Sequence, residues 1–231
     1  MKSKQTSVNM SQGKHVRTLF VGGSRGCGKS TFTMGEADKA TRLVVVDSTL
    51  DYHKEKGYKL FTSLKDLSQA IKANYRKGFK YAYNPFRGLE SIGQDRSKYV
   101  NELAKLLLQV QKSYFENKSN VKILLVLEEA SSCCPAEINL KKEMPYFTHL
   151  IKEGRHFGID FICVDQNSTE VHKIILQNTT EKVLFKQPDM HYIYLSTILQ
   201  SKEYAKIAIS QPKFNYIHKI DSEFKQGETK K

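Results

Sequence analysis

The chain has 231 residues, and 39% of them are hydrophobic, which is enough to bury one sizeable core. Its formal net charge is +13 and its isoelectric point lies near 9.4. This balance is typical of proteins with a polyanionic partner such as DNA or RNA, although a generally basic surface would give the same charge. No run of 18 apolar residues occurs, so the sequence predicts no stable insertion into a membrane.

The N-terminus and the cysteines indicate where the protein works. Residues 1–15 are basic and polar without an apolar segment, so we expect a flexible arm and not a secretory signal. No repeat or low-complexity linker follows, and we interpret residues 16–231 as one domain. The cysteine spacing fits neither a zinc site nor a plausible disulfide, which is typical of a reducing compartment. The four cysteines are Cys27, Cys133, Cys134 and Cys163.

In chain order, short apolar runs bounded by turn residues predict buried strands. These runs are residues 17–23, 41–48, 79–85, 122–129, 158–166 and 181–186. Apolar residues at helical spacing predict helices between them, most clearly at 96–116 and 145–153. Strands that alternate with helices indicate an α/β fold with a mostly parallel central sheet and helices on both faces. The alternating residues 213–221 predict a small strand or hairpin added at the C-terminus.

The stretch GSRGCGKS matches the phosphate-binding pattern G-x-x-x-x-G-K-[ST] in full. It follows the first predicted strand and opens a predicted helix. Glycines let successive backbone N–H groups point at phosphate oxygens, and the helix N-terminus adds partial positive charge. The alternative is a glycine-rich turn that only joins a strand to a helix. The predicted ATP-binding residues are Gly23, Ser24, Arg25, Gly26, Cys27, Gly28, Lys29, Ser30 and Thr31.

Two side chains of this loop have a predicted chemical role. Lys29 would reach the β- and γ-phosphates of ATP, and the Ser30 hydroxyl would ligate Mg²⁺. Both roles require a metal–nucleotide complex at this end of the sheet. ATP and Mg²⁺ are therefore the predicted cofactors.

Two adjacent carboxylates, Glu128 and Glu129, end the apolar run VKILLVL. At the carboxyl edge of a neighbouring parallel strand they would face the bound phosphates. We expect Glu128 to hold Mg²⁺ through its water shell and Glu129 to polarise the water that attacks the γ-phosphorus. The cation would offset the repulsion between the two carboxylates. The alternative is a strand that runs into a solvated acidic turn.

The phosphate loop alone does not separate GTPases, kinases and ATPases. The GTPase patterns DxxG and NKxD are not seen where a GTPase needs them. A second carboxylate directly after the metal-binding one is typical of a hydrolytic ATPase, because water is a poor nucleophile. A small-molecule kinase and a basic DNA-binding protein with a vestigial nucleotide site are the alternative interpretations.

Residues 150–186 contain a helix that ends in Gly-Arg-His, a strand that finishes at Gln166, and a further helix and strand. Together with the phosphate loop and the paired acids, this layout resembles the FtsK/HerA superfamily of RecA-like (ASCE) P-loop ATPases. It is most similar to the genome-packaging ATPases of poxvirus-like viruses and of tailless, membrane-containing double-jelly-roll viruses. The resemblance covers residues 16–195, and its GRHFGI block and strand-terminal glutamine are its more specific motifs.

The resemblance implies catalytic roles for two residues beside Lys29 and Glu129. Gln166 would sense the γ-phosphate and help place the attacking water. Arg155 would be an arginine finger that reaches the nucleotide of the next subunit, where its planar charge suits phosphate oxygens. Without the resemblance, Arg155 reads as a surface cation at a helix C-terminus and Gln166 as a polar strand end.

The sequence departs from the family's pattern at two positions. Glu128 stands where aspartate is usual, which moves the metal-facing carboxylate further from the backbone. Asp165 stands where a threonine commonly precedes the glutamine. Neither change removes a chemical group that the reaction needs.

A member of this superfamily would be an ATP-driven translocase of double-stranded DNA, most concretely the motor that packages a viral genome into a preformed capsid. The implied partners are DNA of any sequence, further copies of the chain in a homo-oligomeric ring (a pentamer or hexamer), and a capsid vertex protein. The implied location is the host-cell cytoplasm and the packaging vertex of the virion. A DNA-transfer or filament-extrusion ATPase is the alternative. Lysine-bearing loops at 52–59, 86–96 and 139–142 are candidates for gripping DNA.

Overall fold

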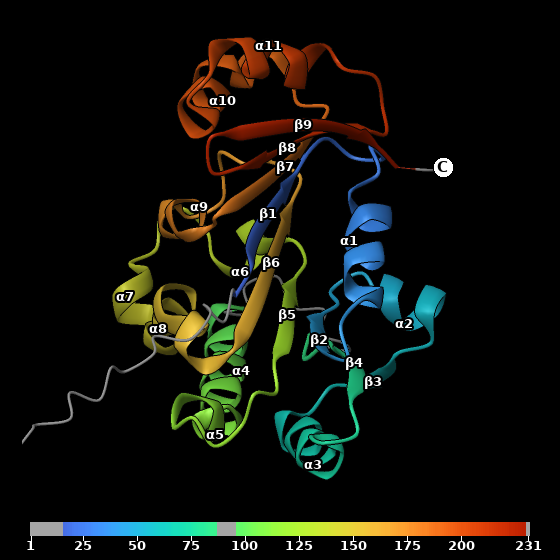
Figure 1. Ribbon diagram of the computed structural model, residues 1–231, viewed down its shortest axis with the longest axis vertical. Coiled ribbons are helices and arrows are strands. Elements are labelled where there is room, and N and C mark those ends of the chain that lie inside the picture. Colours follow the sequence, from blue (N-terminus) through green and yellow to red (C-terminus); the bar gives the residue numbers. More distant parts are fainter. Residues whose placement is uncertain (1–15, 87–95, 230–231) are drawn as a thin grey trace, which may run out of the picture.

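The computed structural model describes residues 16–86 and 96–229, so the predicted arm at 1–15 lies outside the described residues. Its strands are β1 (Thr18–Gly22), β2 (Arg42–Val46), β3 (Lys59–Phe61), β4 (Phe79–Tyr83), β5 (Ile123–Leu127), β6 (Ile159–Asp165), β7 (Glu181–Phe185), β8 (Asn215–Ile220) and β9 (Glu223–Glu228). They form one nine-stranded sheet in the order β3-β4-β2-β5-β6-β1-β7-β8-β9 (Figure 1).

Every neighbouring pair from β3 to β7 is parallel, and β8 and β9 add an antiparallel edge. The predicted α/β fold with a mostly parallel sheet and a C-terminal hairpin is confirmed. Because parallel strands point the same way, β1, β5 and β6 end at one edge of the sheet. β6 lies between β1 and β5, so the strand that precedes the paired glutamates is one position further from β1 than we expected.

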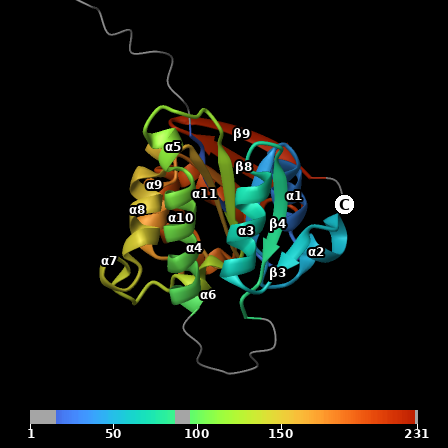
Figure 2. The same ribbon diagram turned by 90° about the horizontal axis from the view of Figure 1, so that it is seen from below.

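The helices lie on both faces of the sheet, as predicted (Figures 1 and 2). They are α1 (Lys29–Asp38), α2 (Asp51–Lys56), α3 (Leu64–Asn74), α4 (Arg96–Val110), α5 (Lys112–Phe115), α6 (Ala130–Cys133), α7 (Leu140–Glu143), α8 (Pro145–Glu153), α9 (Lys173–Asn178), α10 (Tyr192–Leu199) and α11 (Lys202–Ser210), with 3-10 turns η1 (Gly154–Phe157) and η2 (Asp189–His191). Leu19 and Val21 of β1 pack in the core beneath α1 and α2, whereas Phe20 packs in the core of the opposite face. The alternation follows from the two-residue repeat of a strand.

The helix predicted over 96–116 is interrupted at Gln111. α4 ends at Val110, and α5 is a short separate turn. The buried side-chain amide of Gln111 donates to the backbone oxygens of Val121 at 2.8 Å and Gly158 at 3.2 Å. These long-range hydrogen bonds tie the end of α4 to the starts of β5 and β6, and they explain the break that the periodic pattern did not show.

The candidate DNA-gripping loops need correction. Residues 51–56 form helix α2 and not a loop, because Tyr52 is buried against the sheet and fixes the segment there. Residues 140–143 form the short helix α7, which begins at the side-chain cap of Asn139. The third candidate, 86–96, lies mostly outside the described residues.

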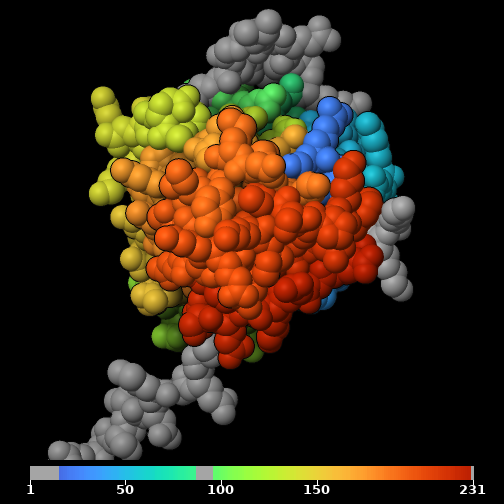
Figure 3. Space-filling view, turned by 90° about the horizontal axis from the view of Figure 1, so that it is seen from above, coloured from blue at the N-terminus to red at the C-terminus, as the bar shows by residue number. Residues whose placement is uncertain are grey.

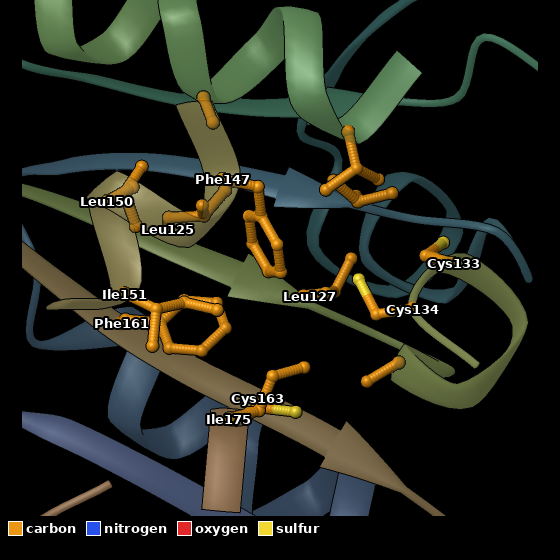
Figure 4. Packing of buried hydrophobic residues seen from close by; sticks show 14 of the residues in the cluster. Leu125, Leu127, Cys133, Cys134, Phe147, Leu150, Ile151, Phe161, Cys163 and Ile175 are labelled. Atoms are coloured by element: carbon orange, nitrogen blue, oxygen red, sulfur yellow. The ribbon is translucent and has the colours of Figure 1, made fainter. Parts of the chain in front are cut away.

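A packed cluster fixes where β5 ends (Figure 4). All five residues of β5 are buried, and Leu125 and Leu127 share a core with Phe147 of α8 and Phe161 of β6. The two phenylalanine rings meet edge to face with centroids 5.9 Å apart. Burying each such side chain stabilises the fold by about 1.5–3 kcal/mol. A shift of β5 along its axis would expose several of them, so the residue after Leu127 is held at the edge of the sheet.

The C-terminal part of the chain covers one end of the sheet. Figure 3 shows residues of this part, in orange and red, making up most of one face of the molecule. Tyr204 of α11 stacks on Phe224 of β9 with ring centroids 3.8 Å apart, which joins the helices to the hairpin. Within the described residues, every helix is too short or too polar to span a bilayer.

Candidate active site

The carboxyl ends of β1, β5 and β6 surround a pocket of about 500 Å³. Residues from four separate segments of the chain meet there, and two of the segments carry the predicted phosphate loop and the paired glutamates. The pocket is lined by Arg25, Gly26, Lys29, Ser30, Thr49, Asp51, Glu128, Glu129, Val164, Asp165 and Gln166. The structure therefore brings together most of the residues singled out from the sequence.

The phosphate loop requires glycine at two positions. Gly28 precedes α1 with φ 104, a backbone conformation that L side chains rarely adopt, and a Cβ there would lie 2.4 Å from Thr229 Oγ1. A Cβ at Gly23 would lie 2.6 Å from the Cβ of Phe185. Within the described helix α1, the first turn carries no acidic side chain, so its partial positive charge is available to an anion.

Lys29 folds back over the loop that it belongs to. Its Nζ donates to the backbone oxygen of Gly23 at 2.6 Å and to that of Ser24 at 3.0 Å. Burial lowers the pKa of the Lys29 ammonium. Phosphate oxygens are charged acceptors and stronger partners than these two carbonyls. The Lys29 ammonium thus lies at the phosphate loop, and a bound phosphate can replace the two carbonyl oxygens as its hydrogen-bond partner.

Segments far along the chain hold the loop in place. The Ser24 N–H donates to the backbone oxygen of Lys186, directly after β7, at 2.9 Å. The Phe214 N–H donates to the backbone oxygen of Cys27 at 3.1 Å. The C-terminal hairpin is therefore part of the site's scaffold, which its alternating sequence pattern did not reveal.

Glu128 is buried at the end of β5, with 9% of its surface exposed. Tyr52 Oη donates to its Oε1 at 2.8 Å. Burial raises the pKa of Glu128 to about 7, the Tyr52 hydrogen bond opposes this shift, and the Asp47 carboxylate adds to it. The carboxyl therefore takes up a proton near neutral pH unless a cation is present to offset its charge.

Glu129 has different partners from its neighbour. Its backbone is left-handed, with φ 50, where the chain turns from β5 into α6. Ser48 Oγ donates to Glu129 Oε2 at 3.0 Å, and Arg96 Nη1 lies 3.9 Å from the same oxygen. A strained backbone at a candidate site is a recurrent feature of functional residues. The turn directs the two adjacent carboxylates to separate sets of contacts.

Sequence reasoning missed Asp47, a further carboxylate beside the site. It follows β2, which pairs with β5, and its side chain is fully buried. Its Oδ2 accepts from the His53 N–H at 3.0 Å, whereas Oδ1 has no partner among the described residues. Burial raises its pKa. The signal was present in RLVVVDS, because an apolar strand ends in an acid there as it does at Glu128.

Gln166 and Asp165 follow β6 at the same edge. Gln166 is exposed and lines the pocket. Asp165 Oδ2 accepts from the Ser131 N–H at 2.6 Å, and its Oδ1 accepts from the Asn167 N–H at 2.8 Å. The aspartate that departs from the family's pattern thus links α6, which follows β5, to the loop after β6.

Arg155 is the predicted site residue that lies away from the pocket of its own chain. It belongs to η1, immediately before β6, and Gln166 immediately follows that strand. Seven strand residues separate the two ends, a span of roughly 20 Å. Arg155 is exposed, and its Nε contacts His156 Nε2 at 3.2 Å. Its guanidinium faces outward at the opposite edge of the sheet.

The residues predicted to hold a metal are Ser30 and Glu128. Ser30 and Glu128 line the same pocket, and both offer the kind of oxygen that Mg²⁺ prefers. No group of three or more His, Cys, Asp and Glu in the described part of the chain could hold a metal unaided. Such a set fits Mg²⁺, which usually takes one or two protein oxygens and completes its shell with phosphates and water.

Residues 18–219 match the family described as zonular occludens toxin (Zot). The chain belongs to the Zot family. The match includes the phosphate loop, both glutamates, and the block that contains Arg155 and Gln166. No curated protein sequence matches this Zot-family chain.

Solved structures share the fold of this Zot-family chain. The genome packaging NTPase B204 of Sulfolobus turreted icosahedral virus 2, in complex with AMPPCP, has a TM-score of 0.69 at 15% identity, covering 92% of this chain and 97% of B204. VirB4 of Thermoanaerobacter pseudethanolicus has a TM-score of 0.62 at 10% identity, covering 95% and 91%. The cytoplasmic domain of the Type VII secretion ATPase EccC of Thermomonospora curvata has a TM-score of 0.59 at 14% identity, covering 94% and 25%.

The family shows the class of enzyme, and the solved structures show the fold. The chain is a P-loop ATPase with a RecA-like fold, and these predictions from the sequence are confirmed. At such low identities, the structures show the fold alone. What the Zot-family chain acts on, and which side chains do the chemistry, has to be argued from its own site.

Proposed function

We propose that this ATPase is a motor that translocates double-stranded DNA, most concretely one that packages a viral genome into a preformed capsid. The proposal rests on one observation. Lys29, Ser30, Glu128, Glu129 and Gln166 line one pocket, whereas Arg155 faces outward from the other edge of the sheet. That division suits a ring in which each subunit completes its neighbour's site. The similarity of its fold to the genome packaging NTPase B204 supports the same function.

ATP binding would use the phosphate loop. The triphosphate takes the place of the carbonyls of Gly23 and Ser24 as the partner of Lys29 Nζ, and the N–H groups at the start of α1 receive its oxygens. Ser30 and Glu128 would hold Mg²⁺, Glu128 through water. The ion supplies neutralising charge to the phosphates. Glu128 then stays ionised despite its burial.

Hydrolysis would depend on Glu129 and Gln166. Glu129 accepts a proton from the attacking water, and its contact with Ser48 holds the carboxylate at the pocket. Gln166 orients the same water from the neighbouring strand end. The partner subunit supplies an arginine in the position of Arg155, whose charge stabilises the transferring phosphoryl group. Coupling between subunits would follow, because neither site is complete alone.

The partners follow from this arrangement. We propose that residues 16–231 act as one ATPase domain, that copies of the chain assemble into a homo-oligomeric ring, and that DNA of any sequence passes along it. A net charge of +13 supports a polyanionic substrate. A capsid vertex protein would dock the ring within the host-cell cytoplasm.

A DNA-transfer or filament-extrusion ATPase is the second candidate. The specific observation in its favour is the fold shared with EccC, a Type VII secretion ATPase. Both candidates use the same nucleotide site. A DNA-transfer ATPase would also move DNA, whereas a filament-extrusion ATPase would move a protein polymer. The experiment below therefore scores hydrolysis and DNA movement separately.

The test measures ATP hydrolysis with and without linear double-stranded DNA, and ATP-dependent displacement of a third strand from a DNA triplex. We expect DNA to stimulate hydrolysis and the third strand to be displaced. Lys29→Ala and Glu129→Gln should each lower the turnover by about 10²–10⁴-fold. Hydrolysis that ignores DNA, with no displacement of the third strand, would overturn the translocase and favour a kinase or a motor acting on another polymer.

A further inference from the structure

A groove of positive charge lies over α9, away from the ATP site. Two cavities, of about 590 and 670 Å³, lie on either side of this helix and share Lys173, Gln177 and Asn178 in their walls. In Figure 1, α9 lies between α10 on one side and α7 and α8 on the other. No residue that lines either cavity also lines the nucleotide pocket. The two cavities form one surface feature, which we call the α9 groove.

Lysines dominate the charge of the α9 groove. The lysines that line it are Lys141, Lys152, Lys173, Lys182 and Lys219. The acidic side chains in its walls are Glu137 and Asp221. The remaining polar lining is largely amide and hydroxyl groups, such as those of Gln177 and Thr180, which both donate and accept hydrogen bonds. The groove therefore suits an anion with many oxygen atoms.

One of these lysines, Lys219, is buried and another, Lys182, is half-buried, and neither forms an ion pair among the described residues. Lys219 is 8% exposed, and its Nζ donates to Gln200 Oε1 at 3.3 Å. Lys182 Nζ donates to the backbone oxygen of Thr179 at 3.0 Å. No carboxylate of the described residues forms an ion pair with Lys173, Lys182 or Lys219. Burial lowers the pKa of both Lys182 and Lys219. Charges placed at this cost without an acidic partner indicate an external anion.

We propose that the α9 groove binds the phosphate backbone of the DNA. The inference rests on the proposed function and adds the surface by which the motor holds its substrate. Two adjoining cavities with lysines along both suit an extended polyanion better than a small one. Lysine is a flexible point charge that grips phosphates without reading bases, as sequence-independent transport needs.

The α9 groove lies near the start of β7, and the ATP site lies near the end of this strand. Lys182 lies near the start of this strand, and Lys186, directly after its end, accepts the hydrogen bond from Ser24 of the phosphate loop. A five-residue strand therefore joins a DNA-binding surface to the nucleotide. Movement of the phosphate loop during hydrolysis would be transmitted along β7 to the DNA.

The test compares two triple variants of the full chain in DNA-binding titrations over a range of salt. Lys173→Gln, Lys182→Gln and Lys219→Gln together remove charge from the groove. Lys65→Gln, Lys72→Gln and Lys77→Gln are the matched control. Lys65 and Lys72 lie in α3 and Lys77 lies shortly after it, and all three side chains are exposed and form no ion pair among the described residues. Each lost phosphate contact lowers the slope of log affinity against log salt by about 0.9.

We expect the groove variant to bind duplex DNA at least about ten-fold more weakly, with its salt slope reduced by about two to three, and the control to bind as the wild type does. In the wild type, DNA should protect Lys173 and Lys182 from acylation and leave Lys65 and Lys72 reactive, a readout that needs no variant to fold. If the groove variant and the control bind DNA with equal affinity and DNA does not protect Lys173 and Lys182 from acylation, the α9 groove is not the DNA-binding surface, although the proposed function could still hold. A change of oligomeric state without loss of DNA binding would also exclude the groove as that surface, and a wild type that binds no DNA would remove the groove and the proposed function together.

Discussion

Tyr52 and Glu128 lie 76 positions apart in the sequence, and a hydrogen bond of 2.8 Å joins them at the base of the pocket. The tyrosine hydroxyl donates, so the bond favours the ionised carboxylate. Burial acts in the opposite direction and is the larger effect, since the pKa of Glu128 still rises to about 7. The site therefore contains a carboxyl that takes up a proton near neutral pH and releases it to solvent when a bound cation offsets the carboxylate charge.

Glu128→Gln should stabilise the nucleotide-free protein at pH 8. The folded-state pKa of about 7 lies above the ordinary value of 4.5, so the folded chain binds a proton that the unfolded chain releases. The contribution of this group to stability is full below pH 4.5 and falls as the pH rises through 7. We expect a gain of about 1–3 kcal/mol at pH 8 and none at pH 4.5, measured by denaturant unfolding.

Tyr52→Phe should change the stability at pH 8 in the opposite direction to Glu128→Gln. It removes the donor that lowers the pKa of Glu128, so this variant should lose stability at pH 8 and lose less at pH 4.5. If Glu128→Gln is no more stable than the wild type at pH 8, the carboxylate is not destabilised by its burial.

Gly28→Ala should lower stability and ATP binding by more than the cost of placing an alanine in a left-handed backbone conformation. A left-handed backbone costs an L-residue about 1–2 kcal/mol, and at Gly28 the added Cβ would also meet Thr229 Oγ1 at 2.4 Å. Gly57→Ala is the matched control, because Gly57 has φ +66 and no atom within 4 Å of the added Cβ. Thermal unfolding and binding of a non-hydrolysable ATP analogue measure both. Equal losses of stability, with ATP binding intact in each, would contradict the role of the close approach.

Arg155 should act on the nucleotide of a neighbouring subunit. Arg155→Ala should lower turnover by about 10³-fold or more and leave the affinity for the ATP analogue near that of the wild type. Mixing this variant with Glu129→Gln should restore part of the turnover, because one interface can then combine an intact arginine with an intact glutamate. Absence of rescue at every mixing ratio would count against an arginine shared between subunits.

Arg155→Lys separates charge from shape at this position. Lysine keeps the positive charge but not the planar fork that contacts two oxygens at once. We expect it to recover only a small part of the turnover lost in Arg155→Ala. Full recovery would show that a charge alone suffices.

Glu181→Gln should destabilise the fold at neutral pH. Glu181 accepts from Arg17 at 2.8 Å and contacts His218 at 2.8 Å, and Arg17 also pairs with Glu36. Burial alone would raise the pKa of Glu181, but the hydrogen bonds from His218 and Arg17 outweigh it and lower the pKa to about 2. A lowered pKa gives stability above the ordinary value of 4.5 that is lost as the pH falls towards 2.

The expected loss is about 1–3 kcal/mol at pH 7, since the side chains are only partly shielded from solvent. Unfolding at pH 7 and at pH 3 measures it, and the difference between variant and wild type should shrink at the lower pH. A constant difference would show that packing, and not charge, explains the effect.

Features that depend on local signals could be predicted from the residues alone. The glycines of GSRGCGKS, followed by the helix that begins at Lys29, were enough to predict a phosphate cradle. The apolar run before Glu128 needs only its neighbours to be a strand that ends in acids. The alternating pattern at 213–221 predicted a strand or hairpin, and β8 (Asn215–Ile220) lies within these residues. These strands were predicted correctly because propensity and periodicity act over a few residues.

The contacts between distant segments could not be predicted in this way and became visible in the folded chain. β6 lies between β1 and β5, Tyr52 and Ser48 reach the two glutamates, and Thr229 closes against Gly28. The fold also places Arg155 at the far edge of the sheet. Strand order and helix docking depend on how distant apolar faces pack together, and no short stretch of sequence carries that information.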